Sequence, residues 1–285
     1  MTEEGTVTDA QLSGQQRGRP GEQLPGAGLD ATRMPGHWLL ARLGKRVLRP
    51  GGAELTRWML DALRITPADQ VVELAAGLGA TARLTLARGP AGYVGVDRDS
   101  AAVATLATLP RTAATRVRWH TADAAHTGLP DASASVVYGE AMLTMQPEPA
   151  KRRIVAEAHR LLGPSGRYGI HELCLIPDDM DQVLAEEVAA ALSQAIHVGA
   201  RPLTVSQWRG LLTGAGFTVT AQSITPMHLL EPRRLIADEG LAGALGIIAQ
   251  TLRDAPSRRR VLHMRKVFRR YRAHLAAVGL VAVRA

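Results

Sequence analysis

The sequence has one cysteine and no long apolar run, and each of these scarcities excludes a class of protein. Cys174 is the only cysteine in 285 residues, so the chain forms neither an internal disulfide framework nor a zinc cluster built on cysteines. A cytoplasmic protein follows as the default. Uninterrupted apolar stretches are short, such as Leu275 to Val283, and none reaches the roughly 18 residues of a membrane-spanning helix.

The chain divides into a polar beginning, a helical cap and one large domain. Residues 1–30 are rich in Thr, Glu, Gln, Gly and Pro, without the basic and apolar regions of a signal peptide, and we expect a disordered tail there. Residues 31–66 are expected to form an N-terminal helical cap, interrupted by the turn-like sequence Arg49-Pro50-Gly51-Gly52. The remainder, 67–285, is expected to be one domain with helical insertions at about 178–213 and 230–275.

The net charge of +8 comes almost entirely from arginine, since Lys45, Lys151 and Lys266 are the only lysines. The positive charge concentrates between residues 258 and 272, where apolar residues recur at helical spacing: Val261, Met264, Phe268, Tyr271 and Leu275. We interpret this segment as an amphipathic helix whose arginines are solvated. Contact with RNA or with a membrane is the alternative.

Short apolar strands alternate with helices from residue 69 onward. The expected strands cover residues 70–74, 92–97, 116–121, 133–139 and 167–174, and the clearest intervening helix covers 151–162. Such alternation predicts an α/β fold with a doubly wound, mostly parallel sheet covered on both faces. A capping box at residues 204–207 opens a later helix, and strands are expected at 217–224 and 277–283.

The strongest motif is Val71-Val72-Glu73-Leu74-Ala75-Ala76-Gly77-Leu78-Gly79-Ala80, a strand that runs into a glycine-rich turn. Such a turn lets a ligand lie against bare backbone at the carboxyl edge of the sheet. The segment Gly77 to Ala82 also satisfies the dinucleotide pattern G-x-G-x-x-A, so an NAD(P)-dependent oxidoreductase is a second interpretation. Glu73 favours a cationic ligand, because a carboxylate at this place repels a pyrophosphate.

Two further acids stand at the ends of expected strands. Asp97 ends the second strand, where a carboxylate accepts the hydroxyl groups of a ribose. Asp123 follows the third strand and has the position to accept from an adenine amino group, although an Asp that forms a turn is equally consistent with the pattern. Asp99 is expected to cap the next helix.

From Val71 to Leu173 the chain resembles class I S-adenosylmethionine-dependent methyltransferases, and most closely the small-molecule group with the ubiquinone and menaquinone C-methyltransferases. The resemblance implies a seven-stranded sheet with a reversed edge hairpin and S-adenosyl-L-methionine as the cofactor. It assigns cofactor contacts to the glycine turn, the second and third strand ends and the fourth strand end: Glu73, Ala75, Gly77, Gly79, Asp97, Arg98, Asp123, Ala124 and Glu140. Ala75 departs from the family, which usually has glycine there.

Methyl transfer is an in-line displacement, so the protein mainly aligns the nucleophile and excludes water. A base is required only for a protonated nucleophile, and Glu140, His171 and Glu172 are the candidates at the strand ends. Strand alternation places His171 and Glu172 on opposite faces. We favour His171 as the catalytic base, with Glu140 as the second candidate, because an unperturbed histidine has a pKa of about 6.5. A His171 satisfied by packing and a backbone hydrogen bond is the alternative.

The expected substrate pocket is an apolar wall with a few polar groups: His37, Trp38, Met142, Met145 and His228. The sequence therefore predicts an S-adenosylmethionine-dependent methyltransferase that acts on a small hydrophobic molecule, with the insertion at 230–275 as a lid. No metal, no membrane span and no nucleic-acid partner are expected. The competing hypotheses are an NAD(P)-dependent oxidoreductase and an RNA-binding or non-catalytic protein on the same fold.

Overall fold

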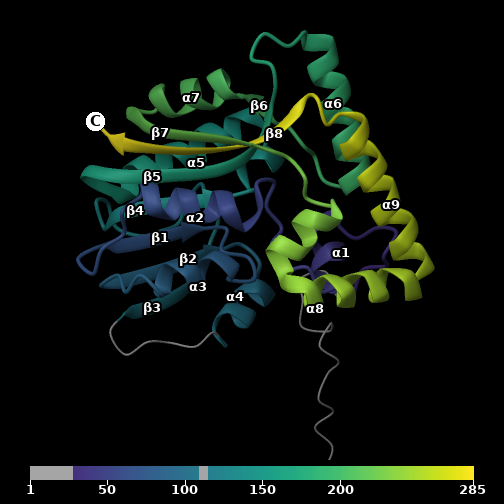
Figure 1. Ribbon diagram of the computed structural model, residues 1–285. Helices are drawn as coiled ribbons and strands as arrows, with labels where there is room; N and C mark the ends of the chain where they lie inside the picture. The colour runs from purple at the N-terminus through teal and green to yellow at the C-terminus, as the bar shows by residue number, and fades with distance from the viewer. Residues whose placement is uncertain (1–27, 109–114) are drawn as a thin grey trace, which may run out of the picture.

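One mixed β-sheet forms the centre of the computed structural model, which describes residues 28–108 and 115–285 (Figure 1). Its strands are β1 (Gln70–Leu74), β2 (Gly92–Asp97), β3 (Arg116–Thr121), β4 (Ala134–Glu140), β5 (Leu162–Leu175), β6 (Leu203–Thr204), β7 (Phe217–Pro226) and β8 (Leu275–Arg284). The order across the sheet is β3-β2-β1-β4-β5-β8-β7, and the short β6 pairs with β5. Strands β1 to β5 are mutually parallel, whereas β8 runs antiparallel to both β5 and β7. The predicted doubly wound sheet and its reversed edge hairpin are therefore confirmed.

The helices fall into two groups. Those around the sheet are α2 (Gly52–Ala62), α3 (Ala80–Leu86), α4 (Ser100–Leu106), α5 (Glu148–Leu161) and α7 (Val205–Thr213), with a 3-10 turn η1 (Leu143–Met145) after β4. The second group lies beyond the carboxyl ends of the central strands and contains α1 (Gly36–Arg42), α6 (Gln182–Ile196), α8 (Pro232–Arg253) and α9 (Ala255–Arg270) (Figure 1). This second group is built from the regions predicted as cap and insertions.

Three apolar cores match this arrangement. Helices α2 and α3 pack on one sheet face through residues such as Met59 and Tyr93, and α5 and α7 pack on the other through residues such as Ile154 and Trp208. The third core joins α1, α6 and α9 beyond the strand ends, and Leu192 is among its buried members. The alternation of apolar residues along the strands thus positions the sheet, and the third core positions the helices that surround the candidate site.

Local sequence signals account for most element boundaries. The predicted bounds of β1, β2 and β3 are those observed, and Asp99 and Thr204 cap α4 and α7 as expected. Two differences concern α5, which begins at Glu148 after Pro147, and β5, which begins at Leu162 instead of residue 167. The strand β6 was not predicted, because two residues carry no alternation. The predicted tail falls largely on residues 1–27, which lie outside the described residues.

Helix α8 has the length and composition of a membrane span, although no uninterrupted apolar run in it reaches about 18 residues. Among the described residues it is the helix that meets both criteria, with a mean hydropathy of 1.3 and 17% of its most apolar window buried. A count of uninterrupted apolar residues does not detect it, because Asp238 and Glu239 interrupt the run together with Gly, Gln and Thr. The helix is broken at Gly240, whose φ of 72° is left-handed.

A buried ion cluster ties α8 to the N-terminal helical region. Lys45 Nζ lies 3.4 Å from Asp238 Oδ2 and 3.6 Å from Glu239 Oε1, and all three side chains are at most 4% exposed. Asp238 Oδ1 also accepts a hydrogen bond from the backbone N–H of Ala53 at 3.0 Å, and Glu239 Oε1 accepts one from Val47 at 2.8 Å. Each buried charge therefore has several partners, which is the condition for tolerating it.

Candidate active site

The glycine-rich turn after β1 follows a left-handed path at three positions. Ala75, Gly77 and Gly79 have φ values of 55°, 55° and 74°. A left-handed alanine is strained by about 1 kcal/mol, whereas glycine adopts this conformation freely. A Cβ atom added at Gly77 would meet only the Ala75 carbonyl oxygen within 4 Å, so this backbone is open to a ligand. Strained non-glycine residues concentrate at functional sites, and Ala141, with φ 53° after β4, is a second case at the same edge.

Asp97 holds the glycine turn from the end of β2. Its Oδ2 accepts from the backbone N–H of Gly77 at 2.9 Å, and its Oδ1 accepts from that of Asp99 at 3.0 Å. Each carboxylate oxygen has a second lone pair, so these bonds leave acceptor capacity for ligand hydroxyl groups. The side chain lies where the sequence places the ribose acid, and it also orders the turn.

The other residues predicted near the nucleoside lie at the same edge but make fewer contacts. Asp123 is exposed and its Oδ1 accepts from the backbone N–H of Ala125 at 2.7 Å, which is the turn-forming role weighed above. Ala124 is half-buried beside it, and Arg98 is exposed after β2. The Arg98 charge reaches His37 on α1, because burial and then Arg98 lower the pKa of His37 to about 4.

Glu73 is buried beneath the turn instead of facing a ligand openly. Its Oε2 accepts from the hydroxyl groups of Tyr138, at 2.7 Å, and of Tyr93, and the residue is 3% exposed. Burial outweighs these hydrogen bonds and raises its pKa to about 7. The prediction that Glu73 repels phosphate and attracts a cation assumed a fully ionised carboxylate. Burial instead favours the protonated form of this carboxyl.

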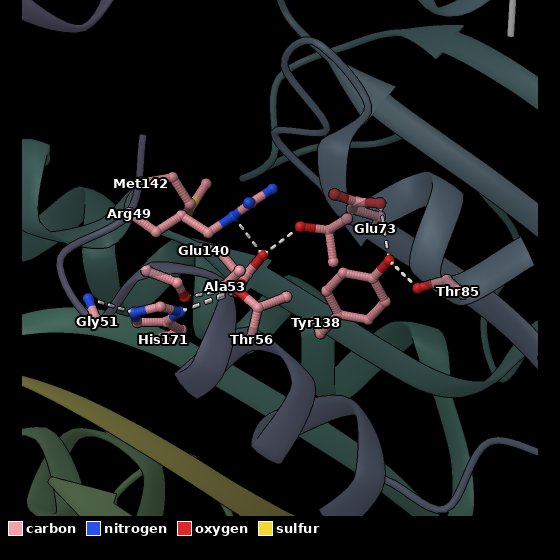
Figure 2. A network of polar contacts seen from close by, with 12 residues as sticks. Arg49, Gly51, Ala53, Thr56, Glu73, Thr85, Tyr138, Glu140, Met142 and His171 are labelled. Atoms are coloured by element: carbon pink, nitrogen blue, oxygen red, sulfur yellow. Dashed lines mark hydrogen bonds and ion pairs between the residues drawn. The ribbon is translucent and has the colours of Figure 1, made fainter. Parts of the chain in front are cut away.

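Glu140, at the end of β4, is the centre of a buried polar network (Figure 2). Its Oε2 lies 2.6 Å from Arg49 Nε and also accepts from the Thr81 hydroxyl, while its Oε1 accepts from Thr56 Oγ1 at 2.6 Å and from His171 Nδ1 at 2.9 Å. Burial opposes ionisation of Glu140, but Arg49 and the hydrogen bonds outweigh it and lower its pKa to about 2. The side chain is 4% exposed. These contacts join the region before α2, helix α3 and strand β5 to one carboxylate.

The predicted base, His171, uses both ring nitrogens within the protein. Its Nε2 accepts from the backbone N–H of Gly51 at 2.9 Å, so its Nδ1 carries the proton that is donated to Glu140 (Figure 2). The side chain is fully buried. A Cβ atom at Gly51 would lie 2.8 Å from Nε2, so glycine is required for this approach. His171 is therefore packed and hydrogen-bonded within the protein. This is the arrangement that the sequence analysis gave as the alternative to a catalytic base.

Glu172 points to the opposite sheet face, as strand alternation predicts. Its two oxygens accept from the backbone N–H groups of Met142, Leu143 and Thr144 at 2.8 to 3.0 Å and from the Thr144 hydroxyl at 2.6 Å. Burial raises its pKa in spite of these bonds. Glu172 therefore holds η1 in place, and a side chain with four such donors is poorly placed to take a substrate proton.

An apolar cavity of about 110 Å³ opens beside these strand ends. A water molecule needs roughly 10 to 15 Å³ measured in this way, so there is room for a small organic molecule. The walls come from α1, the segment after it, the end of β4 with η1, and α6 and α9. They include Gly36, His37, Leu40, Leu48, Pro50, Ala141, Thr144, Met145, Leu173, Leu192, Ile196, Ala200, Met227, Leu229, Met264 and Phe268.

Only two of the five predicted pocket residues line this cavity. His37 and Met145 do, whereas Trp38 lies one helical position away and packs beside the His37 ring, 4.7 Å between centroids. Met142 is buried in the core on the α5 face, and His228 is exposed between Met227 and Leu229, which do line the cavity. Neighbouring positions on a helix or an extended segment point in different directions, and a choice by residue type alone misses that.

Arg49 and Thr56 were not predicted as site residues. Arg49 lies 91 positions before Glu140, in a segment interpreted only as a turn, and no local pattern connects the two. Met264 and Phe268 belong to the apolar stripe that was predicted to cover something, and the cavity is what they cover. Among the described residues no group of three His, Cys, Asp or Glu side chains has the arrangement of a metal site.

Comparison with known proteins places the chain in a family. A family model described as a methyltransferase domain matches residues 71–166. An uncharacterized protein of Haemophilus influenzae is 34% identical over 248 residues, which cover 85% of this chain and 96% of that protein.

Solved structures share the fold at low sequence identity. A phosphoethanolamine N-methyltransferase 2 of Haemonchus contortus, solved with S-adenosylhomocysteine, has a TM-score of 0.64 at 16% identity and covers 87% of this chain and 57% of its own. The cyclopropane synthase MmaA2 of Mycobacterium tuberculosis has a TM-score of 0.59 at 15% identity, over 80% of this chain and 82% of its own. Neither is a ubiquinone or menaquinone C-methyltransferase by name, and that narrower resemblance stays a prediction. The chain therefore belongs to one family with the Haemophilus influenzae protein, and it has the methyltransferase domain and the fold of class I methyltransferases.

Proposed function

We propose that the protein transfers a methyl group from S-adenosylmethionine to a small apolar molecule bound in the cavity between α1, α6 and α9. The observation that carries this proposal is the position of that cavity. The cavity reaches Ala141 and Thr144, which follow β4. The glycine turn follows β1, the parallel neighbour of β4, and so lies at the same edge of the sheet. Ligands of open α/β sheets bind at this edge.

The residues present fit such a cofactor. The open backbone at Gly77 and the remaining lone pairs of Asp97 suit a nucleoside, and neither arrangement requires a phosphate. Glu140 raises the pKa of Glu73 and Arg49, the ion-pair partner of Glu140, lowers it, so the three groups lie near one another. A positively charged ligand near Glu73 would favour its ionised form, so binding of a sulfonium or ammonium group and loss of a proton would be coupled.

When bound, the cofactor supplies a methyl group on a positively charged sulfur. The protein's part is to align the nucleophile and exclude water, which the apolar walls do. We assign Glu140 and His171 a positioning role, because their polar atoms hold Arg49, Thr56 and the backbone at Gly51. His37 is the titratable group on the cavity wall, and its pKa of about 4 leaves it neutral and able to accept a hydrogen bond from a substrate.

We also propose that residues 230–275 form a lid and that the first part of the predicted cap at 31–66, up to Pro50, faces it, because the second part, α2, packs on the sheet. Met264 and Phe268 on α9 line the cavity from one side, and Leu40 on α1 lines it from another. The ion cluster of Lys45, Asp238 and Glu239 joins the two segments. The oxidoreductase alternative loses its basis, since a methyltransferase domain spans the glycine turn on which it rested.

The experiment is incubation of the protein with methyl-labelled S-adenosylmethionine and a fractionated small-molecule extract. We expect label in fractions that partition into organic solvent, and reduced labelling by a Phe268→Ala variant that still binds the cofactor. Labelling only of protein or RNA added to the same reaction would contradict the proposed substrate class. If S-adenosylmethionine does not bind, the proposal that it is the cofactor is contradicted.

A further inference from the structure

Helix α8 carries an apolar stripe that no part of the described chain covers. Leu241, Leu245, Ile248 and Leu252 follow one another at helical spacing and are 63%, 57%, 43% and 59% exposed. The opposite side of the helix is held to the protein by Ala244 and Ile247, which are buried. Single exposed apolar residues are ordinary, whereas a continuous stripe marks a surface that binds something.

A strongly basic face adjoins this stripe. The exposed side of α9 carries Arg258, Arg259, Lys266 and Arg269, with Leu262 among them at 56% exposure. Arg258 Nη1 donates to the carbonyl oxygen of Leu252 at 3.0 Å, so the basic face begins where the stripe ends. Figure 1 shows α8 along the lower edge of the molecule and α9 rising from its end, so both helices form an outer surface.

The acidic groups near these helices are already paired. Asp238 and Glu239 belong to the ion cluster with Lys45, and Asp254 accepts from Ser257 and lies 3.9 Å from Arg42. Glu231 contacts Arg265 and Arg269 at 3.4 and 3.5 Å. Glu231 therefore offsets charge at Arg269, whereas no ion pair among the described residues involves Arg258, Arg259 or Lys266.

We infer that α8 and α9 dock the protein on an anionic lipid surface, with the α8 stripe in the headgroup region and the α9 arginines on the lipid charges. Helices that combine an apolar side with Lys and Arg lie in the membrane interface in this manner. The helix does not span, because Asp238, Glu239 and Ala53 fix its first half to the domain. A second copy is a poorer occupant, because pairing two such surfaces would bring two arginine faces together.

The α9 part of the proposed docking surface is the outer side of a helix whose inner side forms part of the cavity wall. Met264 and Phe268 project from the inner side of α9 into the apolar cavity, while Arg258, Arg259 and Leu262 project from its outer side. A substrate dissolved in the bilayer would then be separated from the apolar cavity by α9. This last step rests on the proposed function, whereas the docking does not.

The test is flotation of the purified protein with vesicles of phosphatidylcholine alone or mixed with phosphatidylglycerol. We expect binding to the mixed vesicles that weakens as salt is added, and little binding to phosphatidylcholine. Leu245→Glu with Leu252→Glu should reduce binding about tenfold or more, since two half-exposed leucines lose their burial in lipid. Arg258→Glu with Arg259→Glu should abolish the preference for the anionic lipid.

Val183→Glu is the matched control, because Val183 is 74% exposed and belongs to α6, outside the α8 stripe and the basic face of α9. It should bind vesicles as the unmodified protein does, and all variants should keep their melting temperature. Absence of binding to anionic vesicles, or an equal loss in Val183→Glu, would overturn the inference. So would a dimer that Leu245→Glu separates without any vesicle binding, or RNA binding that the arginine changes abolish while vesicles are ignored. Because flotation needs no substrate or methyl transfer, its failure is distinct from failure of the proposed activity.

Discussion

Replacing Arg49 with methionine tests the buried network around Glu140 directly. Arg49 Nε lies 2.6 Å from Glu140 Oε2, and the carboxylate is 4% exposed, so Arg49→Met leaves a buried charge without its cation. Removing one partner of a buried pair costs about 3 to 5 kcal/mol of unfolding free energy. The lowered pKa of Glu140 agrees in direction, because Arg49 makes the largest of the contributions that outweigh its burial.

The sign of the pH dependence should reverse in this variant. In the unmodified protein the pKa of Glu140 is lower folded than unfolded, so its stabilisation is complete above pH 4.5 and is lost as the pH falls toward 2. In Arg49→Met burial dominates and raises that pKa above its unfolded value. The buried charge then destabilises at neutral pH, and acidification relieves the cost. The difference between the two proteins should therefore shrink from pH 7 to pH 5.

Urea unfolding followed by tryptophan fluorescence measures these free energies. Glu140→Gln added to Arg49→Met should restore part of the lost stability, because it removes the unpaired charge. The control Arg152→Met breaks a pair with Glu148 whose side chains are 68% and 56% exposed, and it should cost less than about 1 kcal/mol. A cost for Arg49→Met no larger than that of the control, or a deficit that grows on acidification, would refute the reasoning.

The remaining predictions concern ligands and the glycine turn. S-adenosylmethionine should raise the melting temperature of the protein, while NAD and NADP should not. A ligand at 100 times its Kd stabilises the native state by about 2.7 kcal/mol. Stabilisation by NAD alone would contradict the proposal that S-adenosylmethionine is the cofactor. Asp97→Ala should weaken cofactor binding in calorimetry by roughly ten- to a hundredfold, from about 1.5 to 3 kcal/mol per charged hydrogen bond, while Asp123→Ala should cost less because Asp123 is exposed. Met264→Ala with Phe268→Ala should raise the KM for the small substrate more than the Kd of the cofactor, and equal effects on both would contradict their place on the cavity wall. Ala75→Gly should change the unfolding free energy by less than about 1 kcal/mol, since relief of the left-handed strain offsets added freedom of the unfolded chain, whereas Ala75→Val should destabilise by about 1 to 3 kcal/mol.

Local patterns in the sequence were sufficient for the sheet and the glycine turn. Alternation defined β1 to β3, the turn glycines marked the cofactor edge, and the Thr204 capping box marked the start of α7. The antiparallel edge of the sheet followed from the resemblance to class I methyltransferases, because residue patterns do not reveal strand direction. Asp97 was placed by its position at a strand end.

The site's polar partners were not predictable in this way. The ion pair of Arg49 with Glu140 joins positions that no helical or strand period relates, and only the completed fold brings them together. His171 was chosen for the pKa of a free histidine, yet the hydrogen bonds that occupy both its nitrogens come from distant Gly51 and Glu140. The exposed stripe of α8 was missed for another reason, since sequence shows which residues are apolar but not which of them another element covers.

The ion cluster between Lys45 and α8 has a consequence for biosynthesis. Lys45 and Asp238 are separated by 193 positions, so the lysine leaves the ribosome long before either of its carboxylate partners exists. Closing so long a loop is slow, and contacts of this range form late in folding. During synthesis Lys45 stays in water, because a buried ammonium without a partner is too costly. The segment around Lys45 therefore reaches its final place only after most of the chain has been made, and a chain that ends before residue 238 should leave this segment undocked.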